Sequence, residues 1–136
     1  MSGRVLQGHT GIGPRVEGVA LVAKDNFSAR YDLDRIQGVF SRPTHALAGR
    51  SYVGRVLVLN IAKGGVATAW MLNEMKSRDT APAALILNYA NPIMAQGAAF
   101  ADMALIDRFD VDVTNAIPDG ATVDVDPAAG TVTVFE

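Results

Sequence analysis

Residues 55–66 read RVLVLNIAKGGV, and this stretch decides the fold class of the chain. Four consecutive branched apolar residues closed by the polar Asn60 are typical of a buried strand. Gly64 and Gly65 then interrupt the pattern, and apolar side chains recur beyond them at helical spacing, with Met71, Leu72 and Met75 on one face together with Thr68. A strand, a glycine loop and a helix in this order predict a mixed α/β fold with a partly parallel sheet.

The strand-and-helix unit occurs a second time. Residues 83–87 (AALIL) predict another buried strand, and residues 103–106 (MALI) a short third one. Between them, Asn91 suits the N-cap of a second helix and Pro92 its first position. Gly97 is predicted to end this helix in a left-handed conformation.

The flanks of this unit are β-rich. Residues 16–23 (VEGVALVA) predict a buried strand, whereas residues 24–54 predict irregular strands and long loops. Strict alternation in residues 121–126 and 131–135 predicts an antiparallel hairpin. Its buried face should hold Val123, Val125, Val132 and Val134. We therefore expect residues 1–136 to form a single domain, with one or two helices against a central sheet and a C-terminal β-hairpin.

Composition excludes several classes of function. The formal net charge of -2 disfavours nucleic acid as a partner. We find no apolar run long enough to span a bilayer and no signal-peptide pattern at the start, so we expect no membrane partner and a cytoplasmic location. The chain has no cysteine and only two histidines, so we expect it to bind no metal by itself.

The loop after the first quoted strand is the strongest candidate site. Gly64 and Gly65 let backbone N–H groups approach a ligand closely, the following helix presents its positive end, and Lys63 adds a full charge. Together these groups predict a site for a carboxylate or a phosphate. The alternative is that the glycines merely permit a tight turn and Lys63 is solvated. The loop is not a P-loop, because the lysine precedes the glycines.

A second polar group, Ser41, Arg42 and His45, interrupts an apolar stretch. Arginine can hold an anion with two parallel hydrogen bonds, and histidine can move protons near neutral pH, so these three residues are candidate substrate-binding groups. The alternative is that they cap or solvate the surface.

Other polar and aromatic residues are assigned no function. The paired carboxylates should form the wet face of edge strands, and Trp70 should pack its helix. The pairs are Asp110 with Asp112 and Asp124 with Asp126.

Several motifs along the chain, taken in order, resemble the small subunit of aconitase X proteins. They are EGVALV (17–22), DLDRIQG (32–38), THALAG (44–49), GRVLVL (54–59), APAALI (81–86) and IPDG (117–120). The resemblance implies a swivelling β/β/α domain like the fourth domain of aconitase, docked on a large subunit that holds an iron–sulfur cluster. Members of this family dehydrate small hydroxy acids, among them 5-phosphomevalonate and cis-3-hydroxy-L-proline. The lack of cysteine here agrees with a cluster in the partner and no cofactor in this chain.

The sequence departs from the family in the glycine loop. The family loop usually reads Gly-Arg-Gly followed by several serines, one of which resembles the catalytic serine base of aconitase relatives. Here Lys63 replaces the arginine and no hydroxyl follows until Thr68, so Lys63 and Thr68 are the candidate catalytic residues.

Three hypotheses follow. The first is a hydro-lyase small subunit that acts on a small hydroxy acid, is active only with its large subunit, and dimerises with itself when isolated. The second is a non-catalytic binding or regulatory module of the same fold that has lost the serine base. The third is a phosphohistidine carrier around Thr44 and His45, which is disfavoured because Gly49 follows where such a carrier needs a helix.

Overall fold

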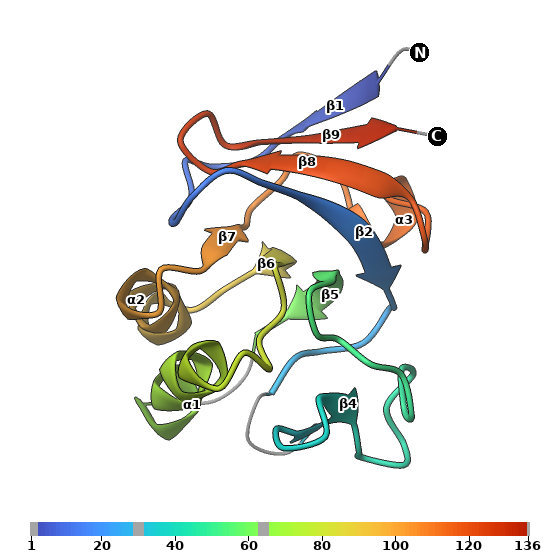
Figure 1. The fold of residues 1–136 in the computed structure, drawn as a ribbon. Coiled ribbons are helices and arrows are strands. Elements are labelled where there is room, and N and C mark those ends of the chain that lie inside the picture. Colours follow the sequence, from blue (N-terminus) through green and yellow to red (C-terminus); the bar gives the residue numbers. More distant parts are fainter. Residues whose placement is uncertain (1–2, 29–31, 63–65, 136) are drawn as a thin grey trace.

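The computed structural model describes residues 3–28, 32–62 and 66–135, without the side chains of residues 66–69. Figure 1 shows three layers: antiparallel strands on one side, parallel strands in the middle, and two helices on the other side. This is the predicted β/β/α arrangement, in which each layer buries an apolar face against the next.

One seven-stranded sheet runs through the first two layers in the order β1-β9-β8-β2-β5-β6-β7. Its strands are β1 (Gly3–Gln7), β2 (Val16–Val22), β5 (Val56–Ile61), β6 (Ala84–Tyr89), β7 (Ala104–Ile106), β8 (Thr122–Asp126) and β9 (Thr131–Phe135). The strand β2 joins the layers, because residues 16–19 pair antiparallel with β8 and residues 20–22 pair parallel with β5. The prediction of a partly parallel sheet is confirmed.

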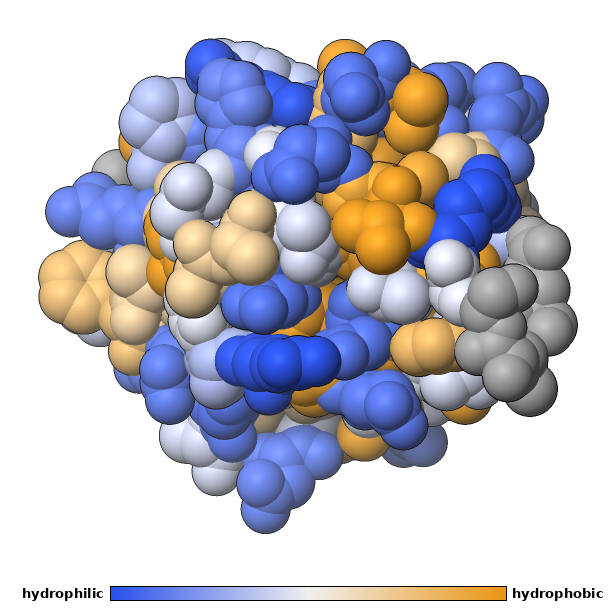
Figure 2. All heavy atoms as spheres, turned by 90° about the horizontal axis from the view of Figure 1, so that it is seen from above, coloured by the Kyte–Doolittle hydropathy of each residue, from blue (hydrophilic) through white to orange (hydrophobic). Residues whose placement is uncertain are grey.

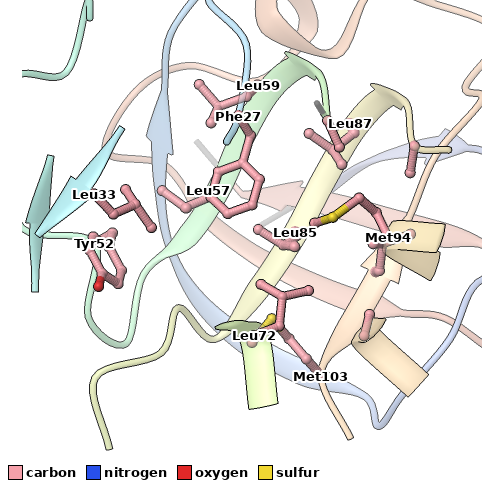
Figure 3. Packing of buried hydrophobic residues seen from close by; sticks show 14 of the residues in the cluster. Phe27, Leu33, Tyr52, Leu57, Leu59, Leu72, Leu85, Leu87, Met94 and Met103 are labelled. Carbon is pink, nitrogen blue, oxygen red and sulfur yellow. The ribbon is translucent and has the colours of Figure 1, made fainter. Parts of the chain in front are cut away.

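Alternation along the middle strands separates two cores. In β5, Val56 and Val58 face the antiparallel layer, while Leu57 and Leu59 face the helices, and all four are fully buried. Figure 3 shows the helix-side core, where Leu85 and other residues of β6 meet the helices. Each fully buried leucine or valine stabilises the fold by about 1.5–3 kcal/mol.

The C-terminal hairpin closes the other core. Its predicted valines are all buried, with Val123 opposite Val134 and Val125 opposite Val132. The alternate side chains point outward and are mostly polar. Figure 2, which looks onto the molecule from above in Figure 1, accordingly shows polar residues over most of the visible surface. The sequence prediction for this hairpin is confirmed.

Two helices, α1 (Val66–Ser77) and α2 (Pro92–Phe100), cover the helix side of the sheet. The predicted face of α1 is confirmed where it is described, since Leu72 and Met75 are fully buried and Met71 packs against the core. Trp70 does not pack as predicted: it is 69% exposed, because helical spacing places it on the side of α1 opposite the buried Leu72 and Met75.

The end of α2 corrects a prediction. Asn91 is its N-cap, as expected, and accepts a hydrogen bond from Met94 N. Gly97 does not end the helix but lies buried within it. The left-handed residue is Asp102, with φ of 53°, and Met103 N donates to Ala98 O at 2.9 Å. This is a Schellman cap, formed where the chain turns toward β7.

Four short elements were not individually predicted. They are β1, which pairs with β9, the helix α3 (Val113–Ala116), and the small β3 (Leu33–Asp34) and β4 (Val39–Phe40) pair. However, β3 and β4 fall in residues 24–54, where irregular strands were expected. Because Asp112 is the N-cap of α3, its expected place on an edge strand is wrong. Asp124 and Asp126 do lie on the outer face of a strand, but β8 is an inner strand of the sheet.

Candidate functional site

The carboxyl ends of the parallel strands gather polar side chains at one edge of the sheet, where α/β folds usually bind ligands. Asn60 of β5 and Asn88 of β6 lie side by side, and Asn88 Nδ2 donates to Asn60 Oδ1 at 3.0 Å. The same nitrogen donates to Asp112 Oδ1 at 2.9 Å, while Asn88 Oδ1 accepts from Val113 N. Both asparagines were predicted to close their strands, but each strand continues one residue further, to Ile61 and Tyr89.

Asp112 is the most heavily hydrogen-bonded carboxylate of this edge. Its Oδ1 accepts from the Thr114 hydroxyl at 2.7 Å and from Thr114 N at 3.0 Å. The Thr114 hydroxyl, and after it the Asn88 amide, hold the pKa of Asp112 below its ordinary value. Asp112 is therefore charged at neutral pH and fixed in orientation, which is the state of a hydrogen-bond acceptor or an electrostatic group and not of a general acid.

A second cluster lies beside the end of β5. Asn60 N donates to Asp25 O at 2.8 Å and Phe27 N to Ile61 O at 2.9 Å, so the segment after β2 runs along this strand end. Arg42 Nε donates to Asp32 Oδ1 at 2.5 Å, and a guanidinium nitrogen of Arg42 lies 3.9 Å from Asp25 Oδ1. The predicted cation Arg42 is thus matched by two carboxylates of its own chain.

Asp25 stays charged beside this arginine. Partial burial by itself would raise the pKa of Asp25, but N–H groups of Ala46 and Asn26 donate to the carboxylate and the net pKa is lowered. Asp32 is 3% exposed, and its second oxygen accepts from Ser28 N at 2.9 Å. The two acids tie the segment after β2 to the loop after β4.

His45 is buried beneath this cluster and stacks on Phe40 with ring centroids 4.6 Å apart. Leu47 N donates to its Nδ1 at 3.0 Å. Because Nδ1 accepts, the ring proton sits on Nε2, which donates to Asn26 O at 2.8 Å. Both ring nitrogens are therefore occupied, and the carrier hypothesis, which needs an accessible nitrogen on His45, loses its support.

The remaining predicted site residues are only partly described. Ser41 is exposed on the loop after β4. Lys63, Gly64 and Gly65 lie outside the described residues, as does the side chain of Thr68. Their roles stay predictions.

Within residues 3–28, 32–62 and 66–135, no three acidic, histidine or cysteine side chains are grouped as a metal site. Among the helices described, none is long and apolar enough to cross a membrane.

Residues 5–134 match the aconitase X swivel domain. The chain belongs to this family. Two relatives are each named a phosphomevalonate dehydratase small subunit. That of Methanocella arvoryzae is 35% identical over 93% of this chain and 96% of its own length. That of Methanothrix thermoacetophila is 36% identical over 87% of this chain and 85% of its own length.

A solved structure confirms the fold of this swivel domain. The crystal structure of aconitase X from Thermococcus kodakaraensis, in its holo-form, superposes with a TM-score of 0.90 at 28% identity. The match covers 98% of this chain and 100% of that one. The β/β/α class inferred from the resemblance is therefore correct.

Sequence reasoning missed one cation, Arg108, at the described carboxyl edge of this swivel domain. Arg108, directly after β7, lies with its guanidinium carbon 5.0 Å from the ring centroid of Tyr89. Asp107 beside it accepts from Ala90 N at 2.9 Å and so fixes the turn into α2. The signal available in the sequence was the polar run that follows the third strand of the unit, which ends at the same edge as Asn60 and Asn88.

A groove in this swivel domain opens at the opposite edge of the parallel strands. Its lining includes Arg15, Gly54, Lys76, Asp79 and Asp102. Lys76 Nζ donates to Asp102 O at 3.1 Å, which closes the ends of α1 and α2 against each other. This groove lies away from the strand ends that carry the candidate site.

Proposed function

We propose that this chain is the small subunit of a two-subunit hydro-lyase of the phosphomevalonate dehydratase type, and that its carboxyl edge forms one wall of an active site shared with a large subunit. The observation that carries the proposal is the match to subunits of that name along nearly the full length of both chains. The fixed polar residues at the carboxyl ends of β5 and β6 support the choice of edge.

In the proposed site, Lys63 and the amides of Gly64 and Gly65 bind an anionic group of the substrate. The support is that α1 begins at Val66, so the positive end of a twelve-residue helix follows the loop directly. Lys63 or Thr68 is proposed as the group that moves the proton, in place of the serine of the resembled family.

Ser41 and Arg42 are proposed to contact the substrate from the second cluster. The Arg42 side chain is 37% exposed, so its guanidinium is partly accessible to a substrate. For His45 the geometry favours positioning of the Asn26 and Leu47 backbone over direct contact, since both of its ring nitrogens are bonded.

An iron–sulfur cluster, which the family resemblance implies, does not fit this chain. Such clusters need thiolate ligands, and the sequence contains no cysteine. We therefore propose that the large subunit binds the cluster.

A non-catalytic regulatory module is the second candidate. One observation favours it: residues 62–67 read AKGGVA and contain no hydroxyl. In that case the chain would bind the large subunit and leave the dehydration rate unchanged.

The test is co-expression with an aconitase X-type large subunit and an assay of dehydration with 5-phosphomevalonate and cis-3-hydroxy-L-proline. Lys63→Ala should lower kcat/KM by on the order of a hundredfold, the loss expected for one charged anion contact. Arg78→Ala is the matched control, because Arg78 is an exposed cation just beyond the other end of α1. Equal rates for Lys63→Ala and the control would remove Lys63 from the mechanism, and an unchanged rate without the small chain would favour the regulatory module.

A further inference from the structure

Arg108 has free donors, in contrast to Arg42 and Arg55. Arg42 bonds Asp32 and Thr44 through its guanidinium, and Arg55 bonds two backbone carbonyls of β2. Arg108 approaches one acid, Asp107, with Nε 3.6 Å from Oδ2, which is longer than a hydrogen bond. Within the described residues, the contacts of its guanidinium are this approach to Asp107 and the stacking over Tyr89, so its two terminal nitrogens donate no hydrogen bond.

The backbone holds Arg108 in an uncommon conformation. Its φ is 58°, in the left-handed region that residues with a side chain rarely adopt. Arg108 N donates to Asn88 O at 3.1 Å, which fixes this turn against the end of β6. Strained residues of this kind concentrate at binding sites, where surrounding structure maintains them.

Tyr89 orients the side chain. The guanidinium lies over the Tyr89 ring at 5.0 Å, and the two side chains are about half exposed, at 48% for Arg108 and 41% for Tyr89. A ring beneath a guanidinium limits its rotation and leaves its edge open to solvent. The planar fork is then ready for two parallel hydrogen bonds to an oxyanion.

This pair lies at the proposed site. Ala62 N donates to Tyr89 O at 3.1 Å, and Ile61 is paired with Tyr89 in the sheet register. Tyr89 therefore ends the strand β6 that flanks β5, and Arg108 lies beside it in the loop after β7, on the same edge as Asn60 and Asn88.

We propose that Arg108, held over Tyr89, binds an oxyanion group of the substrate, either its phosphate or its carboxylate. The identity of the substrate rests on the proposed function, whereas the oxyanion site itself does not depend on that function. A substrate with an anionic group at each end needs two such contacts, and Arg108 supplies one that sequence reasoning did not find.

The first experiment is kinetic and uses the assembled two-subunit enzyme. Arg108→Gln should raise KM for 5-phosphomevalonate by on the order of tenfold to a hundredfold with a smaller change in kcat, and Arg108→Lys should restore part of the loss. Tyr89→Leu, which removes the ring, should raise KM more than Tyr89→Phe, which retains it. Arg78→Gln is the control for loss of one exposed cation.

The unphosphorylated substrate distinguishes the two oxyanions. If Arg108→Gln raises its KM by the same factor, Arg108 binds the carboxylate; if it does not, Arg108 binds the phosphate.

The second experiment separates this proposal from the proposed function. Inorganic phosphate is titrated into the isolated chain while the Arg108 Nε–Hε resonance is followed by NMR. A saturable shift that Arg78 lacks supports the site even if the assembled enzyme dehydrates no hydroxy acid, an outcome that would overturn only the proposed function. Unchanged KM in Arg108→Gln together with no resonance shift overturns the proposal. Loss of subunit assembly in Arg108→Gln also overturns it, because the arginine would then bind the large subunit.

Discussion

At the scale of single residues, the buried polar groups beside β5 bond mainly to backbone atoms of neighbouring segments. Asp32 accepts from Ser28 N, Asp25 from Ala46 N, and His45 joins Asn26 O to Leu47 N. These bonds give shape to a region with little regular secondary structure. A loop built in this way keeps its position without long strands or helices.

We expect His45→Ala to lower the free energy of unfolding by about 3 kcal/mol, because it leaves a cavity against Phe40 and two unpaired backbone groups. Urea denaturation followed by circular dichroism measures the change. His9→Ala is the control, since His9 is exposed and its loss should cost less than about 0.5 kcal/mol. Equal stability of the two variants would mean that His45 is not the centre of this loop.

The residues of the edge could be predicted only in part. Asn60 and Asn88 follow apolar strands that the sequence reveals, so their meeting was foreseeable. The contact of Asn88 with Asp112 depends on α3, which has only four residues. The Tyr89 and Arg108 pair depends on a left-handed turn at a residue that is not glycine. No local sequence pattern predicts either of these two contacts.

At the scale of elements, sequence patterns predicted the long elements with one buried face correctly and missed the short or exposed elements. The strand β5, the face of α1 and the hairpin of β8 and β9 follow from periodicity, because each buries one complete face. In β1 only Leu6 is buried among five residues, so no alternation marks it as a strand. Its pairing with β9 is decided by the tertiary fold.

The left-handed cap of α2 at Asp102 can be tested by substitution. Asp102→Gly should raise the free energy of unfolding by about 0.5–1 kcal/mol, because glycine adopts the left-handed φ of 53° without a steric cost. The Lys76 bond survives, since it is made to the backbone oxygen of residue 102. Thermal unfolding measures the gain.

The matched control variant should change the free energy of unfolding in the opposite direction. Ala99→Gly, at an exposed position inside the same helix, should lower stability by about 1 kcal/mol. A loss of stability in both variants would contradict the Schellman cap.

At the scale of the whole molecule, three carboxylates among the described residues have a lowered pKa: Asp25, Asp112 and Asp124. For Asp124 the main cause is the Arg15 side chain, which donates two hydrogen bonds to it. A carboxyl with a lower pKa in the folded state stabilises the fold above its unfolded pKa of about 4, and this stabilisation is lost as the pH falls through the folded value.

We therefore expect the free energy of unfolding to fall below about pH 4, with these three groups contributing little change between pH 5 and pH 7. The double variant Asp112→Asn with Asp124→Asn should show a shallower fall. The double variant Glu17→Gln with Asp110→Asn, which also removes two exposed carboxylates, is the charge-matched control. An identical acid profile for wild type and the double variant would contradict the assigned contacts.

The isolated chain is predicted to self-associate. Trp70 and Phe100 are 69% and 77% exposed on the two helices. If a homodimer forms, sedimentation velocity should show that Trp70→Glu with Phe100→Glu returns it to a monomer. A dimer that persists in this variant would place the contact on another surface.

We propose above that this chain completes an active site on a larger partner. The most direct measurement is to titrate the purified chain into a purified aconitase X-type large subunit and follow the dehydration of 5-phosphomevalonate. We expect negligible turnover by either subunit alone and a rate that rises with added chain until the two are equimolar. A rate that does not respond to this chain, while the two proteins form a stable complex, would contradict the claim.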